Sequence, residues 1–331
     1  MNILVTGGCG FIGTNLVKML LSQGHTVFNL DSLTYASNKH LAIINNPKYI
    51  HYHDTILNNQ LVGQILKNYK IDHIMHLAAE SHVDRSINSP VVFIQTNIIG
   101  THTLLEEFRT YVKATGRTDH RFLHVSTDEV FGSLAFDSPR FLETSPYDPH
   151  SPYSASKASS DHLVRAYHTT YGLPTLITNC SNNYGPHQHP EKFIPTVIRK
   201  CLNNEPIPVY GNGTNIRDWI HVEDHCRGLI RVLERGVVGE TYLIGGDEEV
   251  NNNDMAQNII DLLNNSIRCE TTSTIELVSD RPGHDLRYAI NSNKIKFNLD
   301  WRKEWDLQAG LIQTIMWYID NGFVERWSRT K

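Results

Sequence analysis

The sequence lacks the features that mark a disulfide-stabilised, zinc-binding or membrane-spanning protein. It contains only five cysteines among 331 residues, widely spaced and without a Cys-x-x-Cys pair. An odd and scattered set of this kind argues against a disulfide framework or a zinc ribbon, and it predicts a reducing, cytoplasmic setting. No apolar run approaches about 18 residues, and a glycine turn follows the first apolar run, so we expect neither a membrane span nor a signal peptide.

The chain also has no excess of positive charge. Its 30 Lys and Arg residues are outnumbered by 35 Asp and Glu residues, which gives a formal net charge of -5. No basic field would therefore attract nucleic acid or anionic lipid, and we expect neither as a partner. Any phosphate that the protein binds must be met by local groups. The length permits one large domain or two smaller ones, and a two-lobed enzyme is the natural expectation.

Short apolar runs of strand length alternate with segments of helical period through the first part of the chain. Strands that are apolar on both sides and separated by helices are typical of a parallel sheet covered by helices on both faces. We therefore predict an α/β fold with a Rossmann-type, doubly wound parallel sheet. The alternating segments are residues 2–5, 14–22, 26–30, 71–78, 90–111 and 121–126.

The later part of the chain predicts a smaller additional lobe. Residues 153–171 have the pattern of a long helix that stops at Gly172, and the sheet is expected to continue through a strand at 175–179 to about residue 180. Beyond this point turn residues become frequent. Further helices are expected at residues 193–203, 222–235 and 254–266. We assign residues 1–184 plus 214–245 to a dinucleotide-binding domain, and 185–213 plus 246–331 to a C-terminal substrate-binding lobe.

A glycine-rich turn follows the first predicted strand and opens the first predicted helix. Gly7, Gly10 and Gly13 stand in a G-x-x-G-x-x-G spacing, and Asp31 lies 18 residues after Gly13. The first two glycines let the backbone approach a pyrophosphate at a helix N-terminus, and the third allows helix and strand to pack closely. The Asp31 carboxylate can accept from ribose hydroxyls and would repel a 2'-phosphate, so NAD is favoured over NADP. The alternative is a glycine turn that serves only helix packing.

Two further segments at strand ends add to the cofactor prediction. Asp54 follows a strand-like run at residues 49–53 and can bind an adenine amino group. Leu77, Ala78 and Ala79 end a buried strand, where small side chains would let a cofactor approach the backbone. For these alanines, ordinary close packing of a helix is the competing interpretation.

Tyr153 and Lys157 lie one helical turn apart, so they share a helix face. An ammonium group about 4 Å from the phenol can lower the pKa of the tyrosine. The resulting phenolate can accept the proton of a substrate alcohol while a hydride leaves for a nicotinamide. The pattern also occurs on many helices with the tyrosine packed and the lysine solvated.

Asp128 and Glu129 follow an apolar strand and Thr127, 24 residues before Tyr153. Two neighbouring carboxylates in a partly dry site titrate as a pair, so that one serves as an acid while the other serves as a base. Oxidation of an alcohol alone needs no such pair, which implies a second reaction. The alternative is that both acids lie on a loop or at a helix start, where acids are favoured, and take no part in chemistry.

With these features in place, the chain resembles the dTDP-glucose 4,6-dehydratase family of extended short-chain dehydrogenases/reductases. The glycine turn and the Tyr-x-x-x-Lys pattern belong to the whole superfamily, whereas the Thr-Asp-Glu triplet and the Arg-Pro-Gly-His segment are far more specific. The resemblance covers nearly the whole chain. It is carried by residues 31–36, 77–87, 126–132, 153–158, 180–186, 190–195, 216–219, 221–225 and 281–284.

The resemblance implies a lyase that converts dTDP-glucose into a 4-keto-6-deoxy sugar. Tyr153, assisted by Thr127 and Lys157, would deprotonate the C4 hydroxyl as NAD takes its hydride. Glu129 would remove the C5 proton and Asp128 would protonate the departing C6 hydroxyl, before the hydride returns to C6. The resemblance also implies tightly held NAD and a homodimer that packs helices including the Tyr153 helix.

The resemblance further implies the residues that contact the two ligands. Arg217 and Arg281 make physical sense as clamps on a diphosphate, although either alone is also consistent with a surface salt bridge. The implied cofactor contacts add Phe11, Ile12, Ser32, Leu33, Thr34, Thr55, Thr96 and Asn183 to those already named. The implied substrate contacts are Ser81, Thr127, Asn182, Lys192, Phe193, Pro208, Val209, Tyr210, Arg217, Asn252, Asp280, Arg281, Pro282, Gly283 and His284.

The chain departs from the family pattern at two places. Thr55 stands where isoleucine is common, and His187-Gln188-His189 stands where an aromatic residue is more usual, which puts fine ligand affinity in doubt rather than the reaction. Neither these histidines nor His221 and His225 have the further ligands that a zinc site needs, so no metal is predicted.

Two other functions remain as alternatives. A nucleotide-sugar 4-epimerase or a simple dehydrogenase would keep the glycine turn and Tyr153 with Lys157, but would not need Asp128 and Glu129. A catalytically silent NAD-sensing or scaffold protein would be expected to have lost one of these groups.

Overall fold

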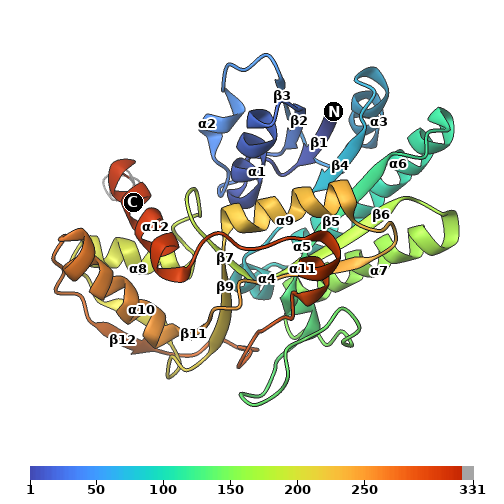
Figure 1. The fold of residues 1–331 in the computed structure, drawn as a ribbon. Helices are drawn as coiled ribbons and strands as arrows, with labels where there is room; N and C mark the ends of the chain where they lie inside the picture. The colour runs from blue at the N-terminus through green and yellow to red at the C-terminus, as the bar shows by residue number, and fades with distance from the viewer. Residues whose placement is uncertain (323–331) are drawn as a thin grey trace.

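The structure, a computed structural model, describes residues 1–322 and is built around a seven-stranded sheet (Figure 1). All six neighbouring strand pairs of this sheet are parallel, in the order β10-β6-β5-β4-β1-β2-β3. The prediction of a doubly wound parallel sheet is therefore confirmed. The strands are β1 (Asn2–Thr6), β2 (Thr26–Asp31), β3 (Tyr49–His53), β4 (His73–His76), β5 (Arg121–Thr127), β6 (Thr175–Cys180) and β10 (Thr241–Ile244).

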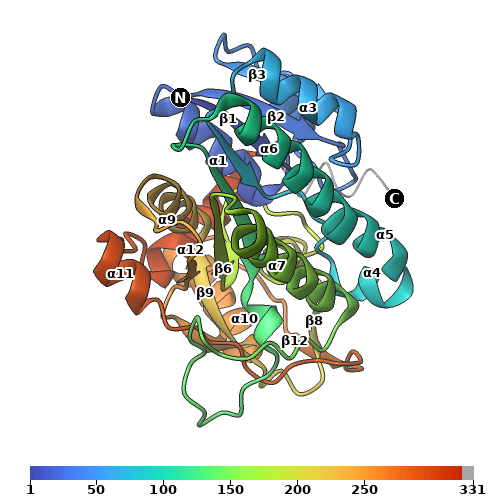
Figure 2. The same cartoon turned by 90° about the vertical axis from the view of Figure 1, so that its right-hand side faces the viewer.

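Helices cover both faces of the sheet because apolar side chains point from both sides of each central strand. On one face α1 (Phe11–Ser22) packs against α9 (Val222–Arg235), followed by α11 (Asn293–Leu299). On the other face α3 (Asn59–Asn68), α6 (Thr101–Thr115) and α7 (Pro152–Tyr171) lie side by side (Figure 2). Helix α7 ends at Gly172, whose φ of 65° is the left-handed conformation that glycine adopts most easily.

The order of the strands reverses beside β1. This strand lies between β2 and β4, so the chain winds outward in both directions from the β1–β4 pair. In open parallel sheets of this type, ligands bind in the crevice outside the carboxyl ends of the strands at such a reversal. The topology thus places a binding site where the glycine turn follows β1.

The helix predicted over residues 90–111 is interrupted. It consists of α5 (Pro90–Phe93), a π-helical segment Ile94–Gly100 and α6, preceded by α4 (Val83–Asn88). The side chain of Asn97, within the π-helical turn, accepts from the Glu80 amide and donates to Ser156 Oγ on α7 at 2.8 Å. These bonds join the wide turn to both the loop after β4 and helix α7, and π-bulges often occur near functional sites.

A second apolar core lies outside the main sheet. It is formed mainly by α8 (Phe193–Leu202), α10 (Asn252–Asp261), the π-helical segment Leu262–Ile267 and α12 (Leu307–Asp320). Two small sheets support it, one of β11 (Glu249–Asn251), β9 (Ile216–His221) and β7 (Asn182–Tyr184), the other of β12 (Ile275–Val278) and β8 (Ile207–Tyr210). The remaining short elements are α2 (Lys39–Ala42) and a 3-10 helix at Asp128–Phe131.

These elements refine the sequence-based organisation. The main sheet does not stop near residue 180, because β10 pairs with β6 after the chain returns through α9. The strands β7 and β9 pair with β11 in a small sheet rather than with the main one. The assignment of two discontinuous lobes stays a prediction, and its residues 323–331 lie outside the part that the structure describes.

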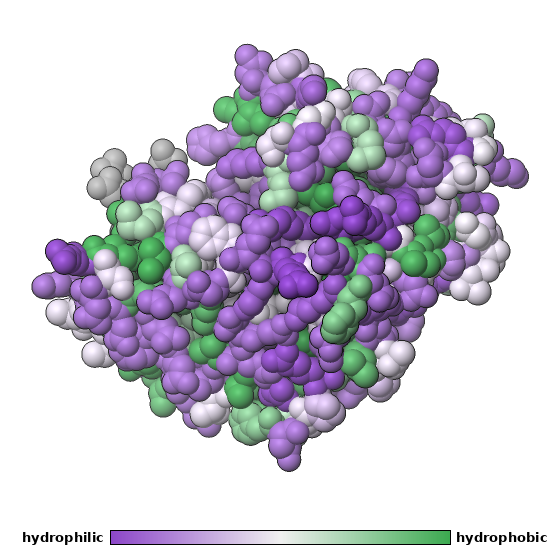
Figure 3. All heavy atoms as spheres, viewed as in Figure 1, coloured by the Kyte–Doolittle hydropathy of each residue, from purple (hydrophilic) through white to green (hydrophobic). Residues whose placement is uncertain are grey.

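Polar and charged residues cover most of the face seen in Figure 3. All five cysteines are free, and four of them are buried. Within residues 1–322, no helix is long and apolar enough to span a bilayer.

Candidate active site

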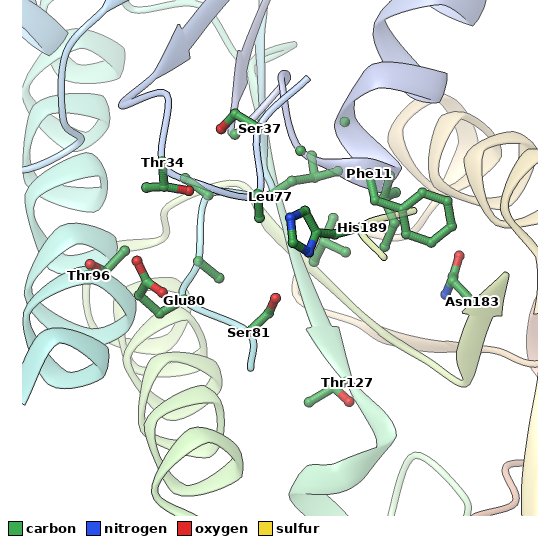
Figure 4. A pocket seen from close by; sticks show the side chains of 18 of the residues that line it. Phe11, Thr34, Ser37, Leu77, Glu80, Ser81, Thr96, Thr127, Asn183 and His189 are labelled. Atoms are coloured by element: carbon green, nitrogen blue, oxygen red, sulfur yellow. The ribbon is translucent and has the colours of Figure 1, made fainter. Parts of the chain in front are cut away.

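A pocket opens at the carboxyl ends of β1, β2, β4, β5 and β6, where the strand order reverses (Figure 4). The glycine turn, the end of β5 and the first turns of α7 all contribute to its lining. Residues predicted to bind a cofactor and residues predicted to do chemistry therefore meet in one cavity.

Of the predicted cofactor residues, all but Leu33 line this pocket. Leu33 has a φ of 51°, its amide donates to Asp31 Oδ1 at 2.8 Å, and its side chain packs on the main core. The others that line the pocket are Gly7, Gly10, Phe11, Ile12, Gly13, Asp31, Ser32, Thr34, Asp54, Thr55, Leu77, Ala78, Ala79, Thr96, Tyr153, Lys157 and Asn183.

The glycine turn combines close packing with an open helix end. A Cβ on Gly13 would lie 2.2 Å from the Gly7 carbonyl, and one on Gly7 would lie 2.7 Å from the Ala78 backbone. Gly7 is thus needed for packing as well as for ligand approach, which refines the role predicted for it. Helix α1 begins after Gly10 without a side-chain cap and without an acidic residue in its first turn. Such a helix end offers amide donors and partial positive charge to a phosphate.

Asp31 is held firmly at the edge of the pocket. Its Oδ2 accepts from the Cys9 amide at 2.8 Å, and its Oδ1 accepts from the Leu33 amide at 2.8 Å and from Ser37 Oγ at 3.2 Å. These bonds fix the carboxylate between the glycine turn and the end of β2, where a ribose hydroxyl can donate to it. Together with the uncapped helix, this cradle fits NAD.

The predicted catalytic residues come together from two elements. Strand β5 ends at Thr127, and the chain turns into the 3-10 helix that carries Asp128 and Glu129. Helix α7 carries Tyr153 and Lys157 in its first turns, which are stabilised by a capping box between Ser151 and Ser154. All five predicted catalytic residues, Thr127, Asp128, Glu129, Tyr153 and Lys157, line the pocket.

The electrostatics of Tyr153 differ from the sequence-based prediction. Burial raises the pKa of the Tyr153 phenol well above its usual value, and the negative charge of Glu129 raises it further, while a hydrogen bond with Thr127 opposes the shift. The Lys157 ammonium donates to the Val125 carbonyl at 2.9 Å, and burial lowers its own pKa. In the chain without cofactor, burial and Glu129 therefore raise the pKa of the phenol rather than lower it, and the tyrosinate stays a prediction.

The two acids occupy different electrostatic environments. Asp128 is 1% exposed, and burial followed by the charge of Glu129 raises the pKa of its carboxyl well above the usual range. Its Oδ2 is buried without a hydrogen-bond partner among residues 1–322. Burial also raises the pKa of Glu129, but the charges of Arg281, Arg217 and Lys192 oppose that shift. Asp128 is thus suited to hold a proton, and Glu129 is better placed to ionise.

Two arginines from the second core act on this pair of acids. Arg217 of β9 is 5% exposed, and its guanidinium lies 4.4 Å from the centre of the Tyr288 ring and donates to the Asp285 carbonyl at 3.0 Å. Arg281 lies 3.7 Å from Asp84 in a partly exposed ion pair. A surface salt bridge was the alternative considered for each arginine, and among residues 1–322 only Arg281 of the two forms one.

The predicted substrate residues divide into two groups. Ser81, Thr127, Asn182 and Lys192 line the pocket. The remainder lie on the second core and its loops without lining it, and they are Phe193, Pro208, Val209, Tyr210, Arg217, Asn252, Asp280, Arg281, Pro282, Gly283 and His284.

Within this second group, side chains differ in their accessibility. The Val209 side chain is 1% exposed and packs in the second core, so only its backbone remains for ligand contact. Pro208 and Tyr210 occupy the opposite, exposed face of β8, and the Tyr210 hydroxyl lies 3.4 Å from Asp84 Oδ2. His284 Nδ1 lies 2.6 Å from Asp280 Oδ1, which braces the loop that carries Arg281.

Several pocket residues were missed by the sequence reasoning. Most directly precede or follow a predicted motif residue, so strand ends and their flanking loops were the signal that could have found them. His189 was noted only as a departure from the family pattern, yet Figure 4 shows its ring between Leu77 and Phe11. The missed lining residues are Leu30, Ala36, Ser37, Ile56, Glu80, Val125, Ser126, Cys180, Ser181, Gln188, His189 and Glu191.

The histidines that raised the question of a metal have other contacts. His187 Nε2 lies 2.6 Å from Lys18 Nζ, His221 Nε2 lies 3.1 Å from Gln313 Oε1, and His225 Nδ1 lies 2.9 Å from Asn183 Oδ1. Burial lowers the pKa of His225 to about 3. Across residues 1–322, no three His, Cys, Asp or Glu side chains are grouped to hold a metal ion.

Comparisons with known proteins identify the family of the chain. Residues 4–314 match the family described as GDP-mannose 4,6 dehydratase. The chain is 51% identical over 327 residues to a dTDP-glucose 4,6-dehydratase of Xanthomonas campestris pv. campestris, covering 96% of this chain and 93% of the relative. It is 48% identical to the Escherichia coli protein of that name, covering 99% and 96%.

A solved structure extends the comparison. The dTDP-glucose 4,6-dehydratase of Streptomyces venezuelae, crystallised with NAD bound, is 44% identical, covers 98% of both chains and superposes with a TM-score of 0.88. The resemblance inferred from the motifs is thereby confirmed, and the chain belongs to the dTDP-glucose 4,6-dehydratase family of extended short-chain dehydrogenases/reductases.

Proposed function

We propose that this chain is a hydro-lyase that converts dTDP-glucose into dTDP-4-keto-6-deoxyglucose with NAD as its resident cofactor. The observation that carries the proposal is the meeting of Asp128 and Glu129 with Tyr153 and Lys157 in one pocket, with the two acids in opposed electrostatic environments. The relatives named dTDP-glucose 4,6-dehydratase support the substrate.

The groove at the glycine turn would hold the cofactor. The open end of α1 would hold the pyrophosphate, the Asp31 carboxylate would accept from the adenosine ribose, and Asp54 would bind the adenine amino group. When bound, NAD supplies the capacity to accept the C4 hydride and to return it at C6.

Tyr153 would take the proton of the C4 hydroxyl. Because the phenol is buried beside Glu129, it releases its own proton only when further positive charge enters the pocket. Lys157 supplies part of that charge from one helical turn away, and Thr127 hydrogen-bonds the phenol and orients it.

Glu129 and Asp128 would then remove water across C5 and C6. A ketone at C4 acidifies the C5 hydrogen, and Glu129 takes that proton while the C5–C6 double bond forms. Asp128 gives its proton to the C6 hydroxyl, which leaves as water. The charges of Arg217, Arg281 and Lys192 favour the ionised form of Glu129, and burial favours the protonated form of Asp128.

The second core would bind the nucleotide. Arg217 and Arg281 offer planar guanidinium groups suited to a diphosphate, and Lys192 and Asn182 line the pocket wall. In this proposal the main sheet binds the cofactor and the second core binds the nucleotide of the substrate.

A 4-epimerase on the same scaffold is the main competitor. It would use the glycine turn, Tyr153 and Lys157, but it has no step for which an acid such as Asp128 is required. Incubation with dTDP-glucose in deuterated water separates the two functions. Loss of water with one deuterium retained at C5 supports the dehydratase, whereas an epimerised sugar of unchanged mass overturns it.

We further propose that the enzyme is a homodimer. Apolar side chains on α4, α5 and the following π-helical turn remain exposed, beside α7, and an exposed patch of this kind suits a protein interface. Light scattering on the purified protein tests this proposal. The side chains are Ile87, Val91, Val92, Ile94 and Ile99, with exposed fractions from 38% to 63%.

A role in deoxysugar biosynthesis and a cytoplasmic location complete the proposal. Five free thiols, four of them buried, are consistent with a reducing compartment. Fractionation of cells that produce the protein tests the location.

A further inference from the structure

Three segments that border the cofactor half of the pocket meet on its outer side. Thr34 and Ser37 line the pocket after β2, Ser81 lines it before α4, and His189 lines it before α8. Each of these segments also contributes one side chain to a compact polar cluster. The cluster consists of Tyr35, Arg85 and Glu191, which we call the clasp.

Every member of the clasp contacts the other two. The Tyr35 hydroxyl donates to Glu191 Oε1 at 2.8 Å. The Arg85 guanidinium lies 3.6 Å from the centre of the Tyr35 ring, and its Nη2 lies 3.7 Å from Glu191 Oε2. A charge-assisted hydrogen bond, a cation–π contact and an ion pair thus close a triangle over three chain segments.

Glu191 is the shared acceptor of this cluster. Its side chain is only 17% exposed, while that of Arg85 is 53% exposed. Glu191 also lies 3.5 Å from His82 Nε2 and 3.6 Å from His189 Nδ1. Isolated exposed ion pairs contribute little, but a partly buried acid that joins three segments ties them together at one point.

The same loop is attached a second time to the segment after β2. His187 Nδ1 lies 3.1 Å from Asn38 Nδ2, and its ring packs 4.6 Å from the ring of Trp317 on α12. Residues 187–191 are therefore attached at two points to the segment after β2, at Tyr35 and at Asn38, and Gln188, His189 and Glu191 line the groove. His189 lies between them, with its ring edge-on to Tyr35 at 5.3 Å.

We propose that the clasp holds residues 187–191 across the cofactor groove and thereby sets the rate at which NAD leaves. Its purpose rests on the proposed function, in which the hydride taken from C4 returns to C6 of the same molecule. If the reduced cofactor left between these two events, the ketone intermediate could not receive the hydride at C6 and the reaction would stop. Retention is therefore a requirement of this reaction, beyond simple binding.

Release of NAD from clasp variants tests the proposal directly. Protein loaded with NAD is freed of excess cofactor, and released NAD is trapped by alcohol dehydrogenase with ethanol, which reports it at 340 nm. Tyr35→Phe removes the hydrogen bond but keeps the ring, and Glu191→Gln removes the charge at nearly constant size. We expect NAD release to become about ten-fold faster in each single variant. In the double variant, the fold increase in release rate should be smaller than the product of the two single increases, because the two residues share one hydrogen bond.

Tyr52→Phe is the matched control, because it also removes one exposed tyrosine hydrogen bond, to Tyr69 at 2.7 Å, away from the groove. Release at wild-type rate is expected for this variant. High salt should speed release from the wild type and have less effect on Glu191→Gln. Release rates within two-fold of wild type in both clasp variants, or an equal rise in Tyr52→Phe, would overturn the proposal.

The release assay contains no sugar nucleotide, so it separates the clasp from the proposed reaction. If the chain fails to dehydrate dTDP-glucose while the clasp variants still lose NAD rapidly, the clasp proposal is supported and the proposed function is overturned. If dehydration holds, we expect progress curves of Tyr35→Phe to decay during turnover and added NAD to restore them. Linear progress curves together with unchanged NAD release would overturn the clasp proposal and leave the proposed function intact.

Discussion

His124 of β5 and Asp161 of α7 form a fully buried pair beneath the catalytic turn, with His124 Nε2 3.1 Å from Asp161 Oδ1. The Asp161 carboxylate also accepts from the Tyr147 hydroxyl at 2.8 Å and from Asn179 Nδ2 at 3.1 Å. Burial opposes the shift, but the contacts with His124 and Tyr147 lower the pKa of Asp161, and burial lowers the pKa of Lys157 while the charge of Asp161, one helical turn later, partly offsets that effect. The predicted catalytic lysine thus has a buried negative charge near it.

Replacing Asp161 should destabilise the protein strongly. Asp161→Asn removes a buried carboxylate that accepts from Tyr147 and Asn179 and whose charge favours protonated Lys157, and each hydrogen bond lost to a charged group costs about 1.5–3 kcal/mol. Urea unfolding measures this loss. Tyr147→Phe keeps the carboxylate but removes the hydroxyl that donates to Asp161 and accepts from Arg165, and it should cost less, about 1–2 kcal/mol. Equal losses in the two variants would show that the charge of Asp161 is unimportant.

Asp128→Asn should separate the two halves of the proposed reaction. The amide cannot give a proton to the C6 hydroxyl, so elimination should slow by about 10²–10⁴-fold while oxidation at C4 continues. Mixing the NAD-loaded variant with dTDP-glucose should then produce a lasting absorbance at 340 nm. Glu129→Gln, which loses the base for C5, is the paired variant and should also stop deuterium incorporation. If Asp128→Asn instead blocks the rise at 340 nm, its assigned role is wrong.

Tyr153→Phe should lose the first step. The variant keeps the ring that packs near Phe93 but has no hydroxyl to accept the C4 proton, so reduction of the cofactor should fall by at least about 10²-fold. Stopped-flow absorbance with dTDP-glucose measures it, and NAD binding should remain close to wild type. Reduction at an undiminished rate would assign the proton to another group.

Stability should fall as the pH is lowered from 7 to 5. Burial lowers the pKa of His124 to about 4 and that of His225 to about 3, so both are neutral in the folded protein at pH 5. The unfolded chain binds protons at these sites near pH 6.5, which favours unfolding below that value. Each histidine should contribute a loss of about 2 kcal/mol between pH 7 and pH 5, until the folded site also titrates. Urea midpoints across this range measure the loss, and a flat profile would contradict neutral buried histidines.

The sequence predicted the main sheet because its strands are apolar on both sides and are separated by helices of clear period. It also predicted residues that the structure brings into one pocket, since Asp128 and Glu129 directly follow β5, and Tyr153 and Lys157 share the first turns of α7. Local spacing decides such relationships. The break in the helix over residues 90–111 was not predictable in this way, because it depends on the contacts that Asn97 makes with Glu80 and Ser156.

By itself, the sequence determined the parallel sheet, the glycine turn at its first helix and the identity of the reacting groups, because each is encoded by neighbours within a turn or a strand. Only the tertiary structure decided the electrostatic environment of each acid. Asp128 is enclosed beside Asp218, while Glu129 is approached by Arg217, Arg281 and Lys192 from segments at least 60 residues away in the chain. The electrostatic environment of a carboxylate depends on its burial and on charges that the fold brings near it. Neither can be predicted from the fact that two acids are adjacent in the sequence.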